Sequence, residues 1–337
     1  MDVAIVILNY NGRRYLEEYL HDLIRHSPGH SVIVVDNAST DDSVQWLRKQ
    51  QPEVRLIELS DNYGFAGGYN RGLSQISADV YILINSDVKV TPGWIEPLIY
   101  LLENVADAAA VQPKIKSLRQ PDYFEYAGAA GGYVDLLGYP FCRGRIFDTL
   151  EKDEGQYDDS CPVFWTSGAC MAIRADAFWK AGGFDEAFFA HQEEIDLCWR
   201  LQRMGYSLFV EPSSVVYHLG GGTLDYQSPR KTFLNFRNNL IMLAKNMTVS
   251  QLIWVLPLRL VLDGIAGIWF LVNGKSTLTW QIVRAHFSFY THLKNIVKQR
   301  KNFNSKSPHT KHVQLFKKAV LVEYFLKGRG YFREFAS

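Results

Sequence analysis

The sequence predicts an α/β fold in which a doubly wound, mostly parallel sheet is followed by a helical C-terminal region. Two observations lead to this prediction. Apolar runs alternate with amphipathic segments over residues 1–112, and a long apolar and basic stretch begins near residue 233. The 337 residues are 47% hydrophobic and 21% charged, which is typical of globular proteins and excludes a disordered or fibrous chain. A chain of this length can hold about two domains.

Residues 1–112 contain four predicted strands, each followed by a predicted helix. The strands are apolar runs that end in polar or Gly-containing loops, and the first helix repeats its apolar residues at helical spacing. The strands cover residues 2–8, 31–35, 54–59 and 79–84, and the helices cover residues 13–26, 41–50, 64–77 and 92–104. This alternation predicts a parallel sheet with helices on both faces.

Residues 113–218 are less regular at first and then return to predicted strands and helices. Gly, Tyr and acidic residues dominate up to residue 160, which predicts a hairpin-like insertion and a mobile acidic loop over residues 151–159. Regular elements follow as a strand near 163–173, helices at 175–181 and about 193–204, and strands around 208–217. We expect residues 1–112 to form a nucleotide-binding half and residues 113–240 a second half of one domain.

Residues 241–337 form a basic and apolar region that we expect to be helical and associated with a membrane. Residues 273–337 hold 13 Lys and Arg against 2 Asp and Glu, a net charge of +11, whereas residues 1–272 hold 23 against 33, a net charge of −10. Residues 252–272 are long enough to span a bilayer, but Pro257, Arg259 and Asp263 are unfavourable there. We therefore favour helices that lie on an anionic membrane surface over a true span or a buried bundle.

The cysteines and the first residues exclude several classes of protein. Four cysteines occur without a C-x-x-C pair, which argues against a zinc ribbon or a thioredoxin-type site and favours reduced thiols in a cytosolic protein. The N-terminus has no basic region before its apolar run, so we expect a strand there and not a signal peptide. The basic C-terminal region is interleaved with apolar residues, which favours a membrane over nucleic acid as its partner.

Polar side chains follow each predicted strand of the first half, where an open α/β sheet binds its ligands. Asp36 can accept a hydrogen bond from a base or a ribose, although a helix cap is the alternative role. The Gly-rich segment 64–72 lets the backbone approach a ligand and opens a helix whose amide end suits phosphate, but it is not a G-x-G-x-x-G fingerprint.

Three further sets of residues are candidates for metal binding or catalysis. Asp87 can bridge a divalent cation to a diphosphate, or it can be an ordinary turn residue. His218 can be a second metal ligand, a phosphate contact or a structural histidine. Glu193, Glu194 and Asp196 crowd three carboxylates at the start of a helix, where they can be ordinary helix-terminal acids or can raise the pKa of one carboxylate toward that of a general base.

Taken together, these residues resemble the family 2 glycosyltransferases with the GT-A fold, a Rossmann-like architecture, and in particular their bacterial rhamnosyltransferase-like branch. The resemblance covers roughly residues 3–240 in the family's order and spacing. It is carried by segments 6–12, 34–41, 61–70, 83–87, 167–171, 182–186 and 193–198, by His218, and by the pair Arg237–Asn238.

The resemblance implies a role for each candidate residue. Nucleotide-sugar binding is assigned to Asn9, Asn11, Asp36, Asn62, Gly64, Asn70 and Asn85. Asp87 matches the last acid of the D-x-D metal motif, His218 matches a second metal contact, and Glu194 falls at the position of the general base. Two positions depart from the family pattern: Asn85 replaces the first acid of D-x-D, and Glu replaces Asp at 194. Glu193 and Asp196 therefore remain alternative bases.

The function implied is an inverting glycosyltransferase that uses Mg²⁺ or Mn²⁺. The donor would be a nucleoside-diphosphate sugar, with dTDP-rhamnose as the first guess, and the acceptor a saccharide or lipid-linked saccharide in cell-surface polysaccharide synthesis. We expect a cytoplasmic enzyme attached peripherally to the inner face of the cell membrane. The alternatives are a nucleotidyltransferase and a non-catalytic sugar-binding protein of the same fold.

Overall fold

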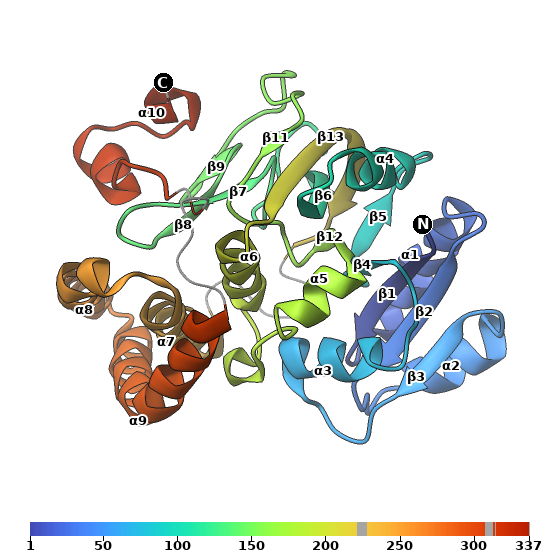
Figure 1. The fold of residues 1–337 in the computed structure, drawn as a ribbon, viewed down its shortest axis with the longest axis horizontal. Helices are drawn as coiled ribbons and strands as arrows, with labels where there is room; N and C mark the ends of the chain where they lie inside the picture. The colour runs from blue at the N-terminus through green and yellow to red at the C-terminus, as the bar shows by residue number, and fades with distance from the viewer. Residues whose placement is uncertain (221–227, 307–312, 314, 337) are drawn as a thin grey trace.

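A large mixed sheet flanked by helices forms the centre of the molecule (Figure 1). The computed structural model describes residues 1–220, 228–306, 313 and 315–336. Within these residues, nine strands form the sheet in the order β11-β13-β6-β12-β4-β1-β2-β3, with β5 paired to β13. Their bounds are β1 Val3–Asn9, β2 Ser31–Asp36, β3 Arg55–Glu58, β4 Val80–Ile84, β5 Val88–Val90, β6 Ala108–Ser117, β11 Cys161–Pro162, β12 Cys170–Arg174 and β13 Ser207–His218.

The first half of the chain is doubly wound, as the sequence predicts. Strands β3, β2, β1 and β4 are parallel neighbours, and Asn9 pairs with Asp36 at the carboxyl ends of β1 and β2. One face of the sheet packs against α1, α2 and α4, and the other packs against α3, α5 and α6. The helices are α1 Arg13–Arg25, α2 Ser43–Gln50, α3 Gly64–Leu73, α4 Glu96–Asn104, α5 Ala175–Lys180 and α6 Glu193–Arg203. The prediction of an α/β fold is confirmed.

Two predicted elements differ from those in the structure. The helix expected over 92–104 begins only at Glu96, because residues 92–95 form a turn after β5. Of the strand expected over 163–173, only the end is a strand: β12 begins at Cys170, and residues 163–169 form a loop between β11 and β12. Strand β12 is antiparallel to β4 and β6, so the parallel order ends there and the second half of the sheet is mixed.

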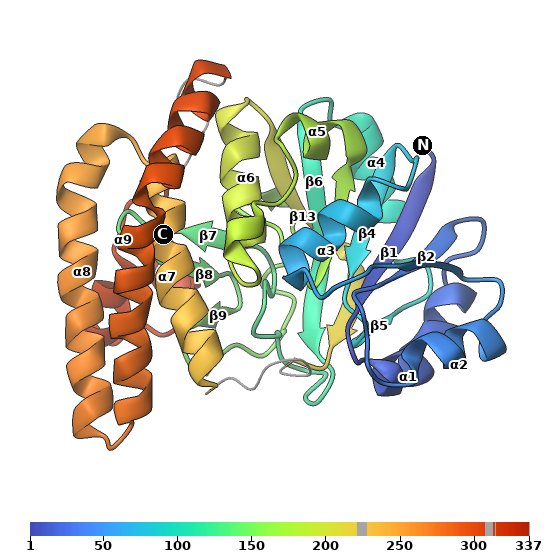
Figure 2. The same ribbon diagram turned by 90° about the horizontal axis from the view of Figure 1, so that it is seen from below.

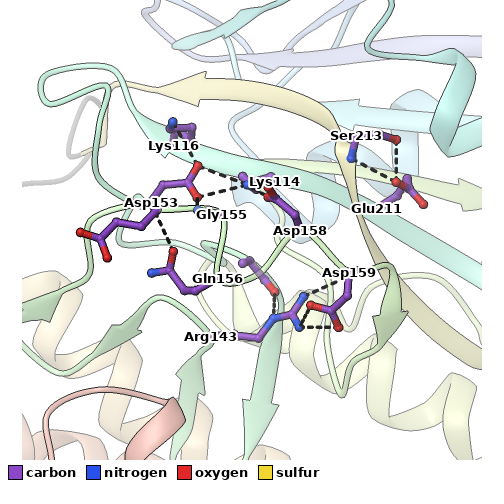
Figure 3. A network of polar contacts seen from close by, with 12 residues as sticks. Lys114, Lys116, Arg143, Asp153, Gly155, Gln156, Asp158, Asp159, Glu211 and Ser213 are labelled. Carbon is purple, nitrogen blue, oxygen red and sulfur yellow. Dashed lines mark hydrogen bonds and ion pairs between the residues drawn. The ribbon is translucent and has the colours of Figure 1, made fainter.

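A small antiparallel sheet covers the second half of the domain, and the acidic loop beside it makes ion pairs with neighbouring lysines and an arginine. The small sheet runs β10-β9-β8-β7, with β7 Gly132–Val134, β8 Pro140–Cys142, β9 Arg145–Ile146 and β10 Thr149–Leu150. Asp153 lies 3.2 Å from Lys114 and 3.1 Å from Lys116, and Arg143 donates to Asp159 at 2.9 Å (Figure 3). Lysines of β6 and Arg143, in the turn between β8 and β9, therefore pair with carboxylates of the predicted acidic loop, and its mobility stays a prediction.

Three long helices, α7 Pro229–Asn246, α8 Val249–Val272 and α9 Ser276–Lys306, pack together beside α6 (Figure 2). Residue 240, the expected boundary of the first region, lies inside α7. Helix α8 is the only helix of the described residues that is long and apolar enough to cross a membrane by length and composition.

The C-terminal segment returns to the small sheet. It contains the π-helical turn η2 Val322–Leu326 and α10 Arg333–Ala336. The backbone N–H groups of Val320 and Phe332 donate to the buried carboxylates of Asp135 (2.8 Å) and Glu151 (3.0 Å). The phenyl ring of Phe332 lies 5.0 Å from the ring of Tyr133 on β7. The end of the described chain is therefore part of the domain's core.

Candidate active site

The loops after β1 and β2 are joined by buried polar contacts. Asn9 is fully buried and donates through Nδ2 to Asp36 Oδ2 at 2.9 Å. The backbone N–H of Ser39 donates to the other oxygen of Asp36 at 2.8 Å. Asn11 is exposed, has a positive φ of 54°, and accepts a hydrogen bond from the Thr40 N–H at 2.7 Å. Asn9, Asn11 and Asp36 thus occupy one edge of the sheet, where the sequence places them.

The loop after β3 joins this edge through Asn37, a residue to which the sequence analysis assigns no role. Asn37 donates to Asn62 Oδ1 (3.1 Å) and to the Gly64 carbonyl (3.0 Å). Gly64 has a φ of +70°, and a Cβ there would lie 2.5 Å from the carbonyl oxygen of Phe189. Position 64 therefore requires glycine, both for its backbone conformation and because the turn before α6 approaches it closely.

Asn70 makes structural contacts in addition to its expected place near the donor. Its side chain donates to the Phe184 carbonyl (2.8 Å) and accepts from the Phe184 N–H (3.0 Å). Further along α3, Gly72 packs against Val35, where a Cβ would come within 2.5 Å. The glycines and Asn70 therefore hold α3 against β2 and against the 182–184 turn.

The loop after β4 lies next to the loop after β1. A Cβ on Gly12 would lie 2.5 Å from Asn9 Oδ1 and 3.4 Å from Ser86 Oγ, so these groups share one space. The backbone N–H of Asn85 donates to the Ala169 carbonyl at 3.0 Å, which connects the same loop to the segment before β12.

Asp87 and His218 meet because β5 pairs with the end of β13, where Val88 faces His218. Both side chains are buried, and His218 Nε2 lies 3.1 Å from Asp87 Oδ1. Nδ1 of the same ring lies 3.2 Å from Glu125 Oε2. Burial opposes the charged imidazolium, but the neighbouring carboxylates outweigh it and raise the pKa of His218 to about 10.

Asp87 and His218 are of residue types that can bind a divalent cation, and they are in direct contact, with 3.1 Å between Nε2 and Oδ1. In the described part of the chain, no group of three or more His, Cys, Asp or Glu side chains could hold a metal ion. The remaining ligands would have to be water and the diphosphate of a donor, which is the usual arrangement for Mg²⁺.

The three acids at the start of α6 differ in their surroundings. Asp196 is fully buried, and its carboxylate accepts from Arg200 (2.9 Å), Lys245 (2.9 Å) and Asn246 (2.7 Å). These cations hold the pKa of Asp196 below its usual value although burial acts in the opposite direction. Both of its oxygens are occupied by partners within the protein.

Glu193 and Glu194 each keep a buried carboxylate oxygen, Oε2, without a hydrogen-bond partner. Burial raises the pKa of Glu194 to about 7, and burial together with the charge of Glu194 raises the pKa of Glu193 well above its usual value. Glu194 lies across Gly168 from Phe65 of α3, since a Cβ on Gly168 would be 3.3 Å from the Phe65 ring and 3.9 Å from Glu194 Cβ. A carboxylate with a pKa near 7 is suited to general base catalysis at neutral pH.

Helix α7 holds the turn that precedes these acids. Phe189, His191 and Gln192 have positive φ values of 64°, 70° and 71°. The Asn238 side chain donates to the carbonyls of Phe188 (3.1 Å), Ala190 (2.8 Å) and His191 (2.7 Å). Arg237 donates to the Phe188 carbonyl at 2.9 Å. The pair Arg237–Asn238 therefore supports the approach to Glu194 from outside the sheet.

These contacts link the loops into one continuous edge. Asp36 bonds Asn9, Asn9 adjoins Ser86 across Gly12, the β4 loop bonds residue 169, and residue 168 adjoins Glu194.

The sequence stretch 4–182 matches the family model described as Glycosyl transferase family 2. The chain belongs to this glycosyltransferase family. It is therefore a glycosyltransferase, and the nucleotidyltransferase alternative is set aside.

Relatives of known activity are sugar transferases. The chain is 31% identical over 241 residues to the N-acetylglucosaminyl-diphospho-decaprenol L-rhamnosyltransferase of Mycobacterium tuberculosis, which covers 66% of this chain and 77% of that protein. It is 25% identical to the low-salt glycan biosynthesis hexosyltransferase Agl10 of Haloferax volcanii, over 74% of this chain and 77% of that protein.

Solved structures of glycosyltransferases share the fold. GalNAc-T7 with UDP, GalNAc and Mn²⁺ matches with a TM-score of 0.56 and 16% identity over 73% of this chain, which spans about half (48%) of that protein. The mannosyltransferase PcManGT of Pyrobaculum calidifontis, in complex with GDP-Man and Mn²⁺, matches with a TM-score of 0.53 and 15% identity over 86% of both chains. These likenesses confirm the GT-A fold expected from the sequence.

Proposed function

We propose that this glycosyltransferase moves a sugar from a nucleoside-diphosphate donor to an acceptor hydroxyl with inversion of the anomeric centre. The observation that carries the proposal is the edge on which Asp36, the Asp87–His218 pair and Glu194 are joined through neighbouring loops. Residues 1–240 supply catalysis in this proposal, with the donor on residues 1–112 and the acceptor on residues 113–240.

In this mechanism Glu194 is the general base. Its Oε2 takes the proton of the acceptor hydroxyl, whose oxygen attacks the anomeric carbon while the bond to the diphosphate breaks. The nucleoside diphosphate leaves with the electron pair, and a single displacement inverts the centre. Glu194 is preferred to Asp196, whose oxygens are bonded to Arg200, Lys245 and Asn246, and to Glu193, which is only 3% exposed.

The donor is held by the loops of the first half. Asn9 and Asp36 hold the nucleoside, and Asn62, Gly64 and Asn70 shape the pocket around its base, ribose and diphosphate. Asn11 and Asn85 also belong to the nucleotide-sugar site. Asp87 and His218 would hold Mg²⁺ or Mn²⁺, which supplies positive charge for the leaving diphosphate when bound. The Mn²⁺ bound in both solved structures supports a divalent cation.

The relatives favour a rhamnosyl donor and a lipid-linked acceptor. We propose dTDP-rhamnose as donor, as the family resemblance implies, and a saccharide on a diphospho-polyprenol as acceptor, because the mycobacterial relative is named an N-acetylglucosaminyl-diphospho-decaprenol L-rhamnosyltransferase. The test is incubation of the full chain with Mn²⁺, a synthetic lipid-linked acceptor and dTDP-, UDP- or GDP-sugars, followed by NMR of the product. We expect transfer from dTDP-rhamnose with an inverted centre. A retained configuration would refute the single displacement. Hydrolysis of the donor with no sugar transferred to the lipid-linked acceptor would refute the acceptor assignment.

We further propose that residues 241–337 attach the enzyme to the inner face of the cell membrane. Helix α8 supports this, because its only charged residues, Arg259 and Asp263, are buried and turned toward the protein. Arg259 donates to the Leu137 carbonyl (3.3 Å), and Asp263 lies 3.5 Å from Arg259 and 3.1 Å from His286 of α9. The charges that are unfavourable in a bilayer therefore have partners inside the protein.

The outer face of α8 is apolar along its whole length. Its exposed large apolar residues are Val249, Ile253, Trp254, Leu258, Val261, Ile265, Ile268, Trp269, Leu271 and Val272. Trp280, Val283 and Phe287 of the neighbouring helix α9 are exposed as well, and Arg284, also exposed, lies 5.4 Å from the centre of the Phe233 ring of α7. A long apolar face beside the basic C-terminal region fits insertion at the interface of an anionic membrane.

Co-sedimentation of the full chain with vesicles tests the attachment. We expect salt-sensitive binding to phosphatidylglycerol-containing vesicles, strongly reduced when Ile265 and Ile268, which are 56% and 64% exposed, are replaced by Glu. Tyr100→Glu on α4, at an equally exposed aromatic residue, is the matched control and should bind as the unchanged chain does. Equal binding of the Ile265→Glu/Ile268→Glu variant would refute α8 as the membrane face.

A further inference from the structure

Glu125 is a buried carboxylate beside the metal-site histidine, and neither the sequence motifs nor the family resemblance assigns it a role. Its Oε2 lies 3.2 Å from His218 Nδ1, on the side of the ring opposite to Asp87. Glu125 is 4% exposed, Asp87 is 4% exposed and His218 is 6% exposed. The imidazole is therefore held between two carboxylates, of which only one is on the side that would face a metal.

The backbone fixes Glu125 at this position. Residues 123–125 fold back along the end of β6: the Ser117 N–H donates to the Tyr123 carbonyl (2.9 Å), and the Glu125 N–H donates to the Ile115 carbonyl (3.1 Å). Strand β6 is in turn parallel to β13, and Ser117 faces His218. The Ala127 N–H also donates to Glu125 Oε2. Residues 123–125 and strand β13 both pair with the end of β6, and this pairing brings Glu125 and His218 together.

The two nitrogens of His218 have different tasks if the ring binds a metal. An imidazole that binds through Nε2 must carry its proton on Nδ1, and a carboxylate bonded to that N–H fixes both the tautomer and the plane of the ring. Glu125 Oε2 lies 3.2 Å from His218 Nδ1, where it is placed to accept this bond. We propose that Glu125 is a positioning residue for the cation site, which acts by holding His218 Nε2 beside Asp87.

This inference rests on the proposed metal-dependent transfer. It predicts an effect on metal affinity that an ion pair with a purely structural role would not produce. A carboxylate that merely stabilised the loop would leave the affinity for the metal unchanged once the protein is folded. A carboxylate that orients the ligand raises this affinity, and removal of such partners costs 10- to 100-fold. Its effect must also vanish when the imidazole it orients is absent.

The experiment is Mn²⁺ binding to the full chain, followed by the EPR signal of free Mn²⁺, for the unchanged protein, Glu125→Gln, His218→Ala and the double variant. We expect Glu125→Gln to bind Mn²⁺ 10- to 100-fold more weakly. The double variant should bind no more weakly than His218→Ala alone. In transfer assays the Gln variant should raise the KM for Mn²⁺ and leave kcat at saturating Mn²⁺ within a few-fold of the unchanged protein.

Glu151→Gln is the matched control, because Glu151 is an equally buried carboxylate of the same half that accepts from Tyr157 Oη (2.9 Å) and from Phe332. It should leave Mn²⁺ affinity unchanged. An unchanged affinity in Glu125→Gln, or an equal loss in the His218→Ala background, would overturn the role of Glu125 alone. Transfer that proceeds with no Mn²⁺ binding in the unchanged protein would overturn the metal-dependent proposal together with this one.

Discussion

Replacement of Glu194 by Gln should slow sugar transfer and at the same time stabilise the folded protein above neutral pH. The two effects have one cause. Burial raises the pKa of this carboxyl from its usual 4.5 to about 7, so the ionised form that accepts a proton is also the form that burial disfavours. Gln keeps the shape of the side chain and carries no charge at any pH.

The magnitudes follow from the pKa. Loss of a general base lowers kcat by about 10²–10⁴-fold, and in the unchanged protein kcat should fall about tenfold for each pH unit below 7. An acid whose pKa is higher in the folded state binds its proton more tightly when folded, so the free energy of unfolding decreases as the pH rises from 4.5 to 7. A difference of 2.5 between pKa 4.5 and 7 corresponds to about 3 kcal/mol, which Gln would restore at pH 8 and not at pH 4.

The assays are initial rates between pH 5 and 9 and urea unfolding at pH 4 and pH 8. Glu96→Gln is the control, because Glu96 also lies in the first turn of a helix but is exposed. It should change neither kcat nor stability appreciably. A Glu194→Gln variant that retains more than a tenth of the activity would place the base elsewhere. A variant that is no more stable at pH 8 than the unchanged protein would refute the assignment of the raised pKa to buried charge.

Two further predictions concern the support that α7 gives to this site. Lys245→Met removes the cation that lies 2.6 Å from Asp185 and 2.9 Å from Asp196, and it should lower the free energy of unfolding by about 3–5 kcal/mol in urea titrations, whereas Lys245→Arg should cost much less. Asn238→Ala removes three hydrogen bonds to the 188–191 turn, and it should lower kcat at least tenfold with little change in the KM for the donor. Unchanged stability in the first variant, or unchanged kcat in the second, would contradict the role given to that side chain.

The fold and the donor half follow from the sequence because their signals are local. An apolar run, a polar residue at its end and an amphipathic segment are all read within about 25 residues, and the carboxyl ends of parallel strands meet whatever the loops contain. Asn9 and Asp36 therefore come together as expected. Asn37 is overlooked only because it stands beside Asp36 and shares its motif.

The contacts that complete the site are not local, and the sequence gives no sign of them. Glu125 lies in an irregular segment and reaches His218 only through pairing with the end of β6. Asp196 carries the same sequence signal as Glu194, and what separates them is Lys245, 49 residues further along the chain. A periodic pattern tells which face of a helix is buried, but it does not tell which buried charge finds a partner.

Helix α8 shows how the partners of buried charges change the interpretation of a sequence. From sequence alone, Arg259 and Asp263 count against contact with lipid, because charges are costly in an apolar medium. In the structure these residues and Val255 follow one another at four-residue spacing on the inner face, and Arg259 lies 3.6 Å from the centre of the Tyr139 ring. The cost of burying them is offset by their contact with each other, by His286 of α9 and by residues 137 and 139, so the outer face is left without charge. The same two residues that weaken the case for a membrane in the sequence therefore support a membrane-facing surface in the folded protein, and Arg259 attaches that surface to the loop between β7 and β8.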